Sequence, residues 1–163
     1  MPEAGPESGV TLPLRVPLQL RWADTDQYRH INNVTAVRLA EEARIRAFGL
    51  PEKPEHFPAG VRPVLAVLGG HTFTMTVGQR IEYLAEMPYT GQDVVAEVWL
   101  SRIGGRSIEM DCRVTDEPGE TVYFIARVAS VIMDLATRRP RQLTDDETAH
   151  LARFAAEPLN FRT

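Results

Sequence analysis

Hydrophobic and polar residues alternate near the start of the chain, in the segment VPLQLRW at residues 16–22. Every second residue from Val16 to Trp22 is apolar, and the residues between them are polar or proline. An alternation of period two is typical of a strand with one buried face. Pro17 has no amide donor for a neighbouring strand, so we expect this strand at an edge of a sheet or Pro17 near its start.

A helical spacing follows two adjacent asparagines. Between Val34 and Phe48, apolar residues recur three or four positions apart, which predicts one long helix. Asn32 or Asn33 suits its N-cap, and Gly49 is expected to end it. The apolar residues are spread widely around the helix axis, so we expect much of its circumference to be covered.

The rest of the chain is predicted to be rich in strands, after a proline-rich loop at residues 51–63. Strand-like runs occupy residues 64–68, 71–87, 93–103, 106–116 and 121–135, with turn residues between them. A short helix is expected after Leu143, because Thr144 and Glu147 form a capping-box pattern. This order of elements predicts an α+β domain with the long helix on one face of an antiparallel sheet.

Size and charge limit what the chain can be. With 163 residues, 44% of them hydrophobic, it suits one domain with a substantial core. Residues 1–13 are rich in Pro, Gly, Glu and Ser and are expected to form a mobile tail, with the domain spanning residues 14–163. The net charge of -4 gives no reason to expect nucleic acid as a partner. No run approaches the roughly 20 apolar residues of a membrane span, so we expect a soluble, cytoplasmic protein without a membrane partner.

Metal chemistry has little support in the sequence. Cys112 is the single cysteine, which excludes an internal disulfide and a cysteine-based metal cage. The four histidines, His30, His56, His71 and His150, do not have a spacing suited to zinc. We therefore expect no metal site and no redox cofactor.

Small polar groups are concentrated just before the long helix, in RWADTDQYRHINN at residues 21–33. A helix N-terminus presents unpaired amides and a positive dipole end, so it can hold the oxyanion formed when a carbonyl is attacked. An acidic side chain just before it, such as Asp26, can act as general base or nucleophile. The same residue types also cap helices and form turns, so the pattern alone leaves both interpretations open.

The segment from Arg21 to Arg44 resembles the 4-hydroxybenzoyl-CoA thioesterase-like family of hotdog-fold acyl-CoA thioesterases. Members carry R-W-x-D-x-D, then H-[IV]-N-N, then a helix with E-E-A-R, and residue types and spacing agree here. Residues 83–114 are similar to the family's tyrosine strand, its Pro- and Gly-containing turn and two long strands. The resemblance implies a single hotdog domain, an antiparallel sheet wrapped around a long central helix, assembled as a homodimer or homotetramer.

The resemblance also implies roles for individual residues. The essential carboxylate of the family corresponds to Asp26, and its oxyanion donor to the backbone amide near Asn33. The family assigns no such role to Asp24, for which we expect a turn hydrogen bond. His30 is a candidate for orienting the carboxylate or contacting the thioester, with packing in the loop as the alternative. Asn32, a candidate substrate contact, suits a helix cap better than a catalyst.

Two features of this chain bear on the acyl pocket. Ala36 and Leu39 stand on the helix where the family commonly has a tyrosine. Residues 69–79 look longer than the family's usual second strand, and an extra hairpin or an extended strand there could reshape the acyl pocket. A related branch of thioesterases has a catalytic glutamate on this helix. Here Glu41 and Glu42 are interpreted as a salt-bridged helix face.

An acidic protein that binds coenzyme A needs a local basic patch for the phosphates. Arg102, Arg106 and Ser107 flank the IGGR turn and are candidate substrate-binding residues, although solvated arginines are a simpler explanation. A second basic run at residues 138–141 is expected to close the last strand.

The leading hypothesis is hydrolysis of an acyl-CoA thioester by water, with Asp26 as base or nucleophile. One alternative is a hotdog protein that binds acyl-CoA without turnover. Another is a hydratase or dehydratase on the same fold, which would need an Asp/His pair above a β-carbon.

Overall fold

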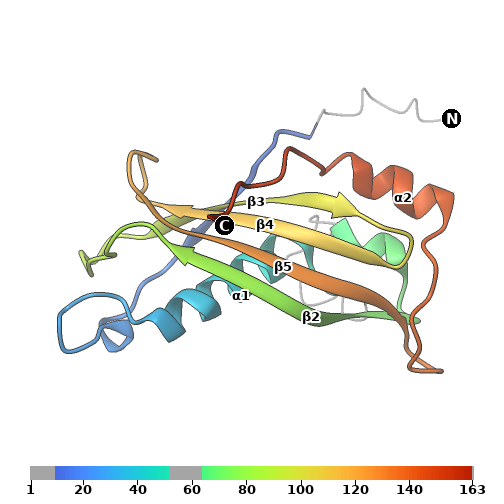
Figure 1. The fold of residues 1–163 in the computed structure, drawn as a ribbon, viewed down its shortest axis with the longest axis horizontal. Helices are drawn as coiled ribbons and strands as arrows, with labels where there is room; N and C mark the ends of the chain where they lie inside the picture. The colour runs from blue at the N-terminus through green and yellow to red at the C-terminus, as the bar shows by residue number, and fades with distance from the viewer. Residues whose placement is uncertain (1–9, 52–63, 163) are drawn as a thin grey trace, which may run out of the picture.

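The computed structural model describes residues 10–51 and 64–162, which form one sheet curled around a helix (Figure 1). Five antiparallel strands stand in the order β1-β3-β4-β5-β2. The strands are β1 (Leu14–Leu18), β2 (Thr72–Tyr83), β3 (Val94–Ile103), β4 (Ser107–Thr115) and β5 (Val122–Asp134). Strand β1 lies at an edge of the sheet, as the missing amide donor of Pro17 predicts, and Pro17 itself is exposed.

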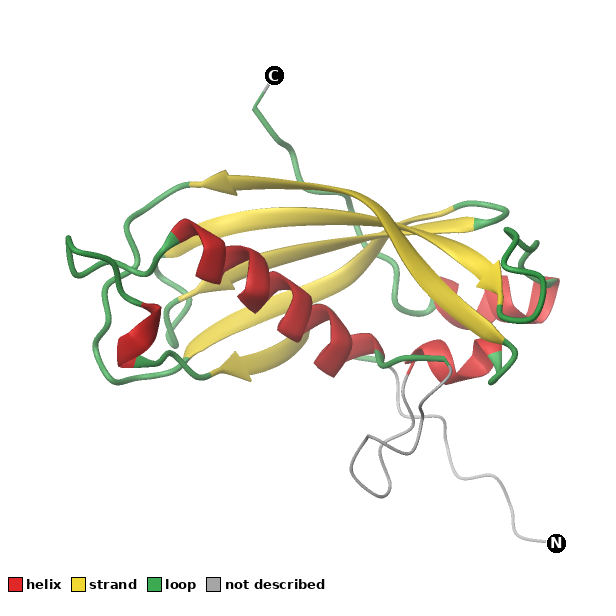
Figure 2. Ribbon diagram, turned by 90° about the horizontal axis from the view of Figure 1, so that it is seen from below, coloured by secondary structure: helices red, strands yellow, loops and turns green. Residues whose placement is uncertain are grey.

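The central helix α1 spans Asn33–Phe48 and lies along the concave face of the sheet, as Figure 2 shows. Asn32 is its N-cap, and the side-chain Oδ1 accepts a hydrogen bond of 2.8 Å from the amide of Val34. The helix ends at Gly49, whose φ of 79° favours glycine. The predicted helix and its boundaries are confirmed.

Small side chains bring α1 close to the sheet. Three alanines, Ala36, Ala40 and Ala43, are almost completely buried on the face that meets the strands. Leu39 and Phe48 are fully buried beside them and fill the core. The predicted α+β class, an antiparallel sheet wrapped around a long central helix, is thus confirmed.

One predicted strand is wrong, and another is shorter than predicted. The segment VLAVL forms a 3-10 helix, Val64–Leu68. An apolar run without alternation suits either a strand or a helix, and here the helix buries Val64, Leu65 and Leu68. The first strand ends at Leu18, and Trp22, expected on the buried face, begins a 3-10 turn and is 77% exposed. Asp24 stabilises this turn by accepting a hydrogen bond of 2.9 Å from the amide of Arg21.

The long second strand is extended rather than folded into an extra hairpin. It pairs with β5 over its whole length, with a bulge between Thr76 and Gly78. Thr74 and Thr76 pair with buried β5 residues before the bulge, and Gln79 and Ile81 do so after it. The bulge therefore keeps both halves of the strand facing α1.

The C-terminal helix α2, Asp145–Ala152, begins at the predicted capping box. Thr144 accepts from the amide of Glu147, and the Glu147 carboxylate accepts from the amide of Thr144. Arg141 binds the same carboxylate through two hydrogen bonds of 2.8 and 2.9 Å. The basic run at residues 138–141 thus contributes a structural ion pair near the end of β5.

Some predictions fall outside the described residues: the tail except for residues 10–13, the loop at residues 52–63, and His56. Within residues 10–51 and 64–162, no helix has both the length and the apolar composition needed to cross a membrane.

Candidate functional site

Asp26 shapes the turn that leads into α1. Its Oδ1 accepts hydrogen bonds from the amides of Tyr28, at 2.8 Å, and His30, at 3.1 Å. The carbonyl of Asp26 accepts from Arg29, which has a positive φ of 64° and closes the turn. One carboxylate oxygen is therefore held by the loop backbone, which fixes the direction of the other.

Asp24 has a different environment, although it is only two residues away. Its side chain is 7% exposed, and Oδ2 accepts from Nη2 of Arg38 at 3.1 Å in addition to the amide of Arg21. Arg38 belongs to α1, so this ion pair joins the turn to the helix body. The expected turn hydrogen bond of Asp24 is present, and its carboxylate is occupied by structural partners.

The segment after β2 closes the other side of the turn. The amide of Ile31 donates to the carbonyl of Met87 at 2.8 Å, and the backbone of His30 bridges to Pro88. The His30 Nε2 lies 3.3 Å from an Oε2 of Glu86, and its side chain is half-buried. His30 is thus positioned by both its backbone and its ring.

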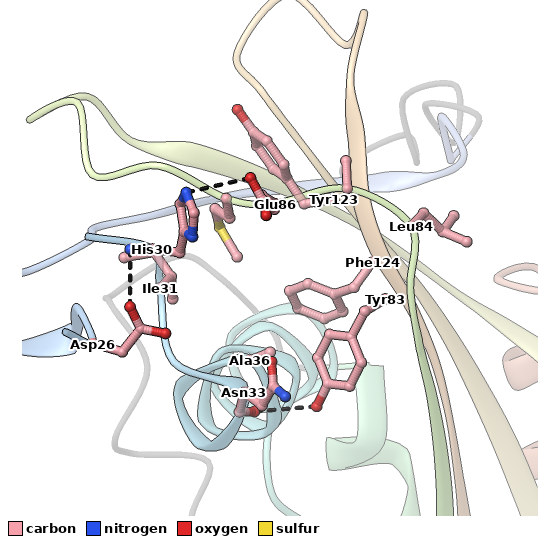
Figure 3. A pocket seen from close by; sticks show the side chains of 12 residues that line it. Asp26, His30, Ile31, Asn33, Ala36, Tyr83, Leu84, Glu86, Tyr123 and Phe124 are labelled. Carbon is pink, nitrogen blue, oxygen red and sulfur yellow. Dashed lines mark hydrogen bonds and ion pairs between the residues drawn. The ribbon is translucent and has the colours of Figure 1, made fainter. Parts of the chain in front are cut away.

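These elements enclose a cavity of about 370 Å³ at the N-terminal end of α1 (Figure 3), here called the Asp26 cavity. The cavity brings together three residues singled out from the sequence, Asp26, His30 and Asn33. Its other lining residues are Ile31, Ala36, Tyr83, Leu84, Ala85, Glu86, Met87, Tyr123 and Phe124. Asp26 and the first residue of α1 therefore line one cavity, an arrangement that suits attack on a carbonyl group.

Two tyrosines in the cavity wall, Tyr83 and Tyr123, were not among the site residues predicted from the sequence. The hydroxyl of Tyr83 donates to the carbonyl of Asn33 at 3.2 Å, which ties the end of β2 to the first residue of α1. Burial, with a smaller contribution from Asp116, raises the pKa of Tyr123. The tyrosine strand of the family resemblance indicated Tyr83, but nothing in the local sequence indicated Tyr123.

The remaining candidate substrate-binding residues lie elsewhere. Asn32 caps α1 and does not line the Asp26 cavity. Arg102, Arg106 and Ser107 surround the β3–β4 hairpin, at the opposite end of the sheet from the turn before α1 (Figure 1). Arg102 lies 3.7 Å from Glu109, and Arg106 donates to Gln142. Within one chain, these basic residues and the cavity are not brought together.

Other titratable groups on the sheet and helix have structural surroundings. Glu42 pairs with Arg38 at 3.1 Å and Arg46 at 3.7 Å, which agrees with the predicted salt-bridged face. Cys112 is buried, and this burial, with nearby Asp111, raises its pKa to about 12. Among the described residues, no three His, Cys, Asp or Glu side chains gather in a way that could hold a metal ion.

Comparison with known proteins agrees with this architecture. The sequence profile of the thioesterase-like superfamily matches residues 20–154. No curated protein matches the chain significantly.

Similar solved structures include a thioesterase superfamily protein from Jannaschia sp. CCS1, with a TM-score of 0.71, 14% identity, and coverage of 92% of this chain and 98% of that one. A predicted thioesterase from Bacillus stearothermophilus has a TM-score of 0.69 and 22% identity, covering 88% and 97%. The DHNA-CoA thioesterase from Staphylococcus aureus has a TM-score of 0.64 and 14% identity, covering 85% and 87%. At these identities the likeness establishes the shared fold.

Proposed function

Since this chain belongs to the thioesterase-like superfamily, we propose that it is a cytoplasmic enzyme that hydrolyses acyl-CoA thioesters to free acids and coenzyme A. The observation that carries the proposal is the position of Asp26 and of the first residue of α1, Asn33, at one cavity. This cavity has the volume of a small-molecule site and is lined by both apolar and polar groups.

In this proposal Asp26 activates the attacking water. One oxygen is held by the amides of Tyr28 and His30, so the other can take a proton from water as the water oxygen bonds to the thioester carbon. The carbonyl oxygen becomes an oxyanion, which the amide of Asn33 stabilises with the dipole of α1. The C–S bond then breaks, and the coenzyme A thiolate takes the proton from Asp26. Direct attack by Asp26 on the carbonyl carbon, followed by hydrolysis of the anhydride, uses the same groups.

The neighbouring side chains have supporting roles. His30 shares the cavity with Asp26, and its contact with Glu86 fixes the orientation of the ring, which can then contact the thioester. Tyr83 holds the first turn of α1 through the carbonyl of Asn33, so it positions the oxyanion donor. Neither role needs a metal ion or redox cofactor.

Binding of coenzyme A is proposed to involve a second subunit. Arg102, Arg106 and Ser107 are remote from the Asp26 cavity of their own chain, so they can hold the phosphates of a substrate in this cavity only from another copy. The free edge of β2 offers a place for a copy to bind, because Met75 and Val77 are 42% and 57% exposed there. A homodimer or homotetramer is the expected assembly.

Release of free thiol from a panel of acyl-CoAs tests the proposed reaction. Steady thiol release by the purified protein supports hydrolysis, and binding of acyl-CoA without thiol release would instead identify a binding protein. Loss of an enoyl-CoA absorbance without thiol release would identify a hydratase. If neither reaction nor binding occurred across chain lengths, the proposed function would be wrong.

A further inference from the structure

Arg44 is a largely buried cation with an unpartnered donor atom. It lies on the third turn of α1 and is 9% exposed, and its Nε has no hydrogen-bond partner among the described residues. The only ion pair found for it within residues 10–51 and 64–162 is with Glu41, at 3.8 Å, which is too long for a hydrogen bond. Burial lowers the pKa of Arg44, and Glu41 opposes this shift. A buried donor without an acceptor is unfavourable, so a ligand that supplies an acceptor at this position would be stabilised there.

A cavity of about 160 Å³ lies beside this guanidinium and is here called the Arg44 cavity. It is lined by Val37, Glu41 and Arg44 from α1, Thr76 and Gln79 from β2, and Val128 from β5. The polar groups that surround it can donate hydrogen bonds from a guanidinium, a hydroxyl and an amide. The site is therefore suited to a ligand group that accepts several hydrogen bonds.

Both cavities are lined by residues of α1, β2 and β5, so they lie between the helix and the β2–β5 pair. Tyr83 pairs with Phe124 at the Asp26 cavity, and Gln79 pairs with Val128 at the Arg44 cavity. Four residues of strand separate these pairs, or about 13 Å. The helix covers a similar distance, because Ala36 at the first cavity and Arg44 at the second are about 12 Å apart along its axis.

The side chains between the two cavities are apolar. Ile81 pairs with Ala126 midway between the two cavities; Ala126 belongs to the apolar core and Ile81 packs against it. Val37 is half-buried on the helix, next in sequence to Ala36 of the Asp26 cavity. A ligand long enough to reach from the Asp26 cavity to the Arg44 cavity would thus meet a polar site, then apolar side chains, and then a cation.

We propose that Arg44 binds the far end of the acyl group, and that the preferred substrates are acyl-CoAs with a terminal carboxylate. This inference rests on the proposed thioester hydrolysis and specifies its substrate class. A carboxylate suits the site because its two oxygens match the donors of one guanidinium. Glu41 is 65% exposed, so it can turn to water when the ligand carboxylate arrives.

The test compares substrates of equal chain length with and without the terminal carboxylate: suberoyl-CoA against octanoyl-CoA, and adipoyl-CoA against hexanoyl-CoA. One of the two chain lengths should fit the distance between the cavities better. In that pair, the wild-type protein is expected to have a larger kcat/KM for the diacid derivative than for the monoacid derivative. Arg44→Met keeps the aliphatic stem and removes the charge, so the kcat/KM ratio of diacid to monoacid should fall by roughly 10- to 100-fold, the range of a charge-assisted hydrogen bond. Arg46→Met removes a more exposed arginine of the same helix and should leave this ratio unchanged.

Binding is measured separately from turnover, with Asp26→Asn protein and the same pairs of acyl-CoAs in thermal shift assays. A larger stabilisation by suberoyl-CoA than by octanoyl-CoA, abolished by adding Arg44→Met, supports the role of Arg44 even if hydrolysis is not observed. Hydrolysis without any preference for the diacid would overturn the Arg44 assignment while leaving the proposed function intact. The assignment is also wrong if Arg44→Met leaves the preference unchanged and converts the protein to monomers, since a second copy would then supply the acceptor. Folding does not limit the test, because replacing a buried charge by an apolar side chain should raise the melting temperature of the ligand-free protein.

Discussion

Asp26→Asn and Asp24→Asn are expected to have different effects: the first should lower turnover, and the second should lower the stability of the fold. Asp26→Asn keeps the Oδ1 that accepts from the amides of Tyr28 and His30, so the turn before α1 should form as before. The substitution removes the oxygen that takes a proton from water. Loss of a positioned general base lowers turnover by roughly 10²- to 10⁴-fold, so we expect a folded protein with turnover reduced by this amount.

Asp24→Asn should instead affect stability. The Asp24 carboxylate is buried and accepts a hydrogen bond from Arg38, whose side chain is 36% exposed. A charged hydrogen bond contributes about 1.5–3 kcal/mol, which partial exposure of Arg38 reduces to about 1–2 kcal/mol. In a domain of this size each kcal/mol moves the melting temperature by about 2–4 °C, so we expect a decrease of about 2–8 °C.

Both variants are examined by thermal melting followed by circular dichroism and by thiol release from an acyl-CoA at saturating concentration. The expected pattern is a near-normal melting temperature with lost turnover for Asp26→Asn, and a lower melting temperature with much smaller loss of turnover for Asp24→Asn. Near-wild-type turnover in folded Asp26→Asn would refute its catalytic role. Equal loss of turnover in both variants, with equal melting temperatures, would refute the separation of roles.

Three further predictions concern binding, assembly and pH. Replacing Arg102 and Arg106 together by alanine should raise KM more than it lowers kcat, and added salt should reduce the difference from wild type; unchanged kinetics would exclude these residues from the coenzyme A site. Val77→Lys places a charge at the exposed edge of β2 and should shift the protein toward monomers in sedimentation equilibrium, with loss of thiol release; a fully active monomer would contradict the proposed assembly. Burial alone would raise the pKa of Glu147, but hydrogen bonds from Arg141 and a backbone amide lower it, so its ionised form stabilises the fold above the pKa of an unfolded glutamate. Glu147→Gln should therefore lower the melting temperature at neutral pH, and this difference should shrink as pH falls through the acidic range; a constant difference down to pH ~3 would contradict the argument.

Local chemistry explains why much of the fold was predictable. Asn32 and Thr144 cap the two helices through side-chain contacts with residues two or three positions away, so the sequence indicates both helix starts. Strand β4 is similarly evident from its own alternation of polar and apolar residues. Leu65 in VLAVL is the contrary case, because its burial in a 3-10 helix depends on packing against distant elements such as α2.

The candidate site was predictable only where it is local. Asp26, His30 and Asn33 come from one short segment, and they do line one cavity. Tyr123 and Arg44 acquire their surroundings from the pairing of β2 with β5 and from the placement of α1, which connect residues far apart in sequence. The pattern within a short segment does not predict which side chains are buried when distant strands pair.

The bulge in β2 accommodates one extra residue, so that the strand on either side of it presents the correct side chains to α1. Side chains that face α1 have even numbers up to Thr76 and odd numbers from Gln79 onward, and the extra residue at the bulge absorbs this change. Deleting Val77 would therefore give a regular strand in which Gln79, Ile81 and Tyr83 still face the helix. What would change is the free edge, because an uninterrupted strand is flatter and pairs more readily with other chains. Loss of this residue should thus alter self-association while preserving the set of side chains that face α1.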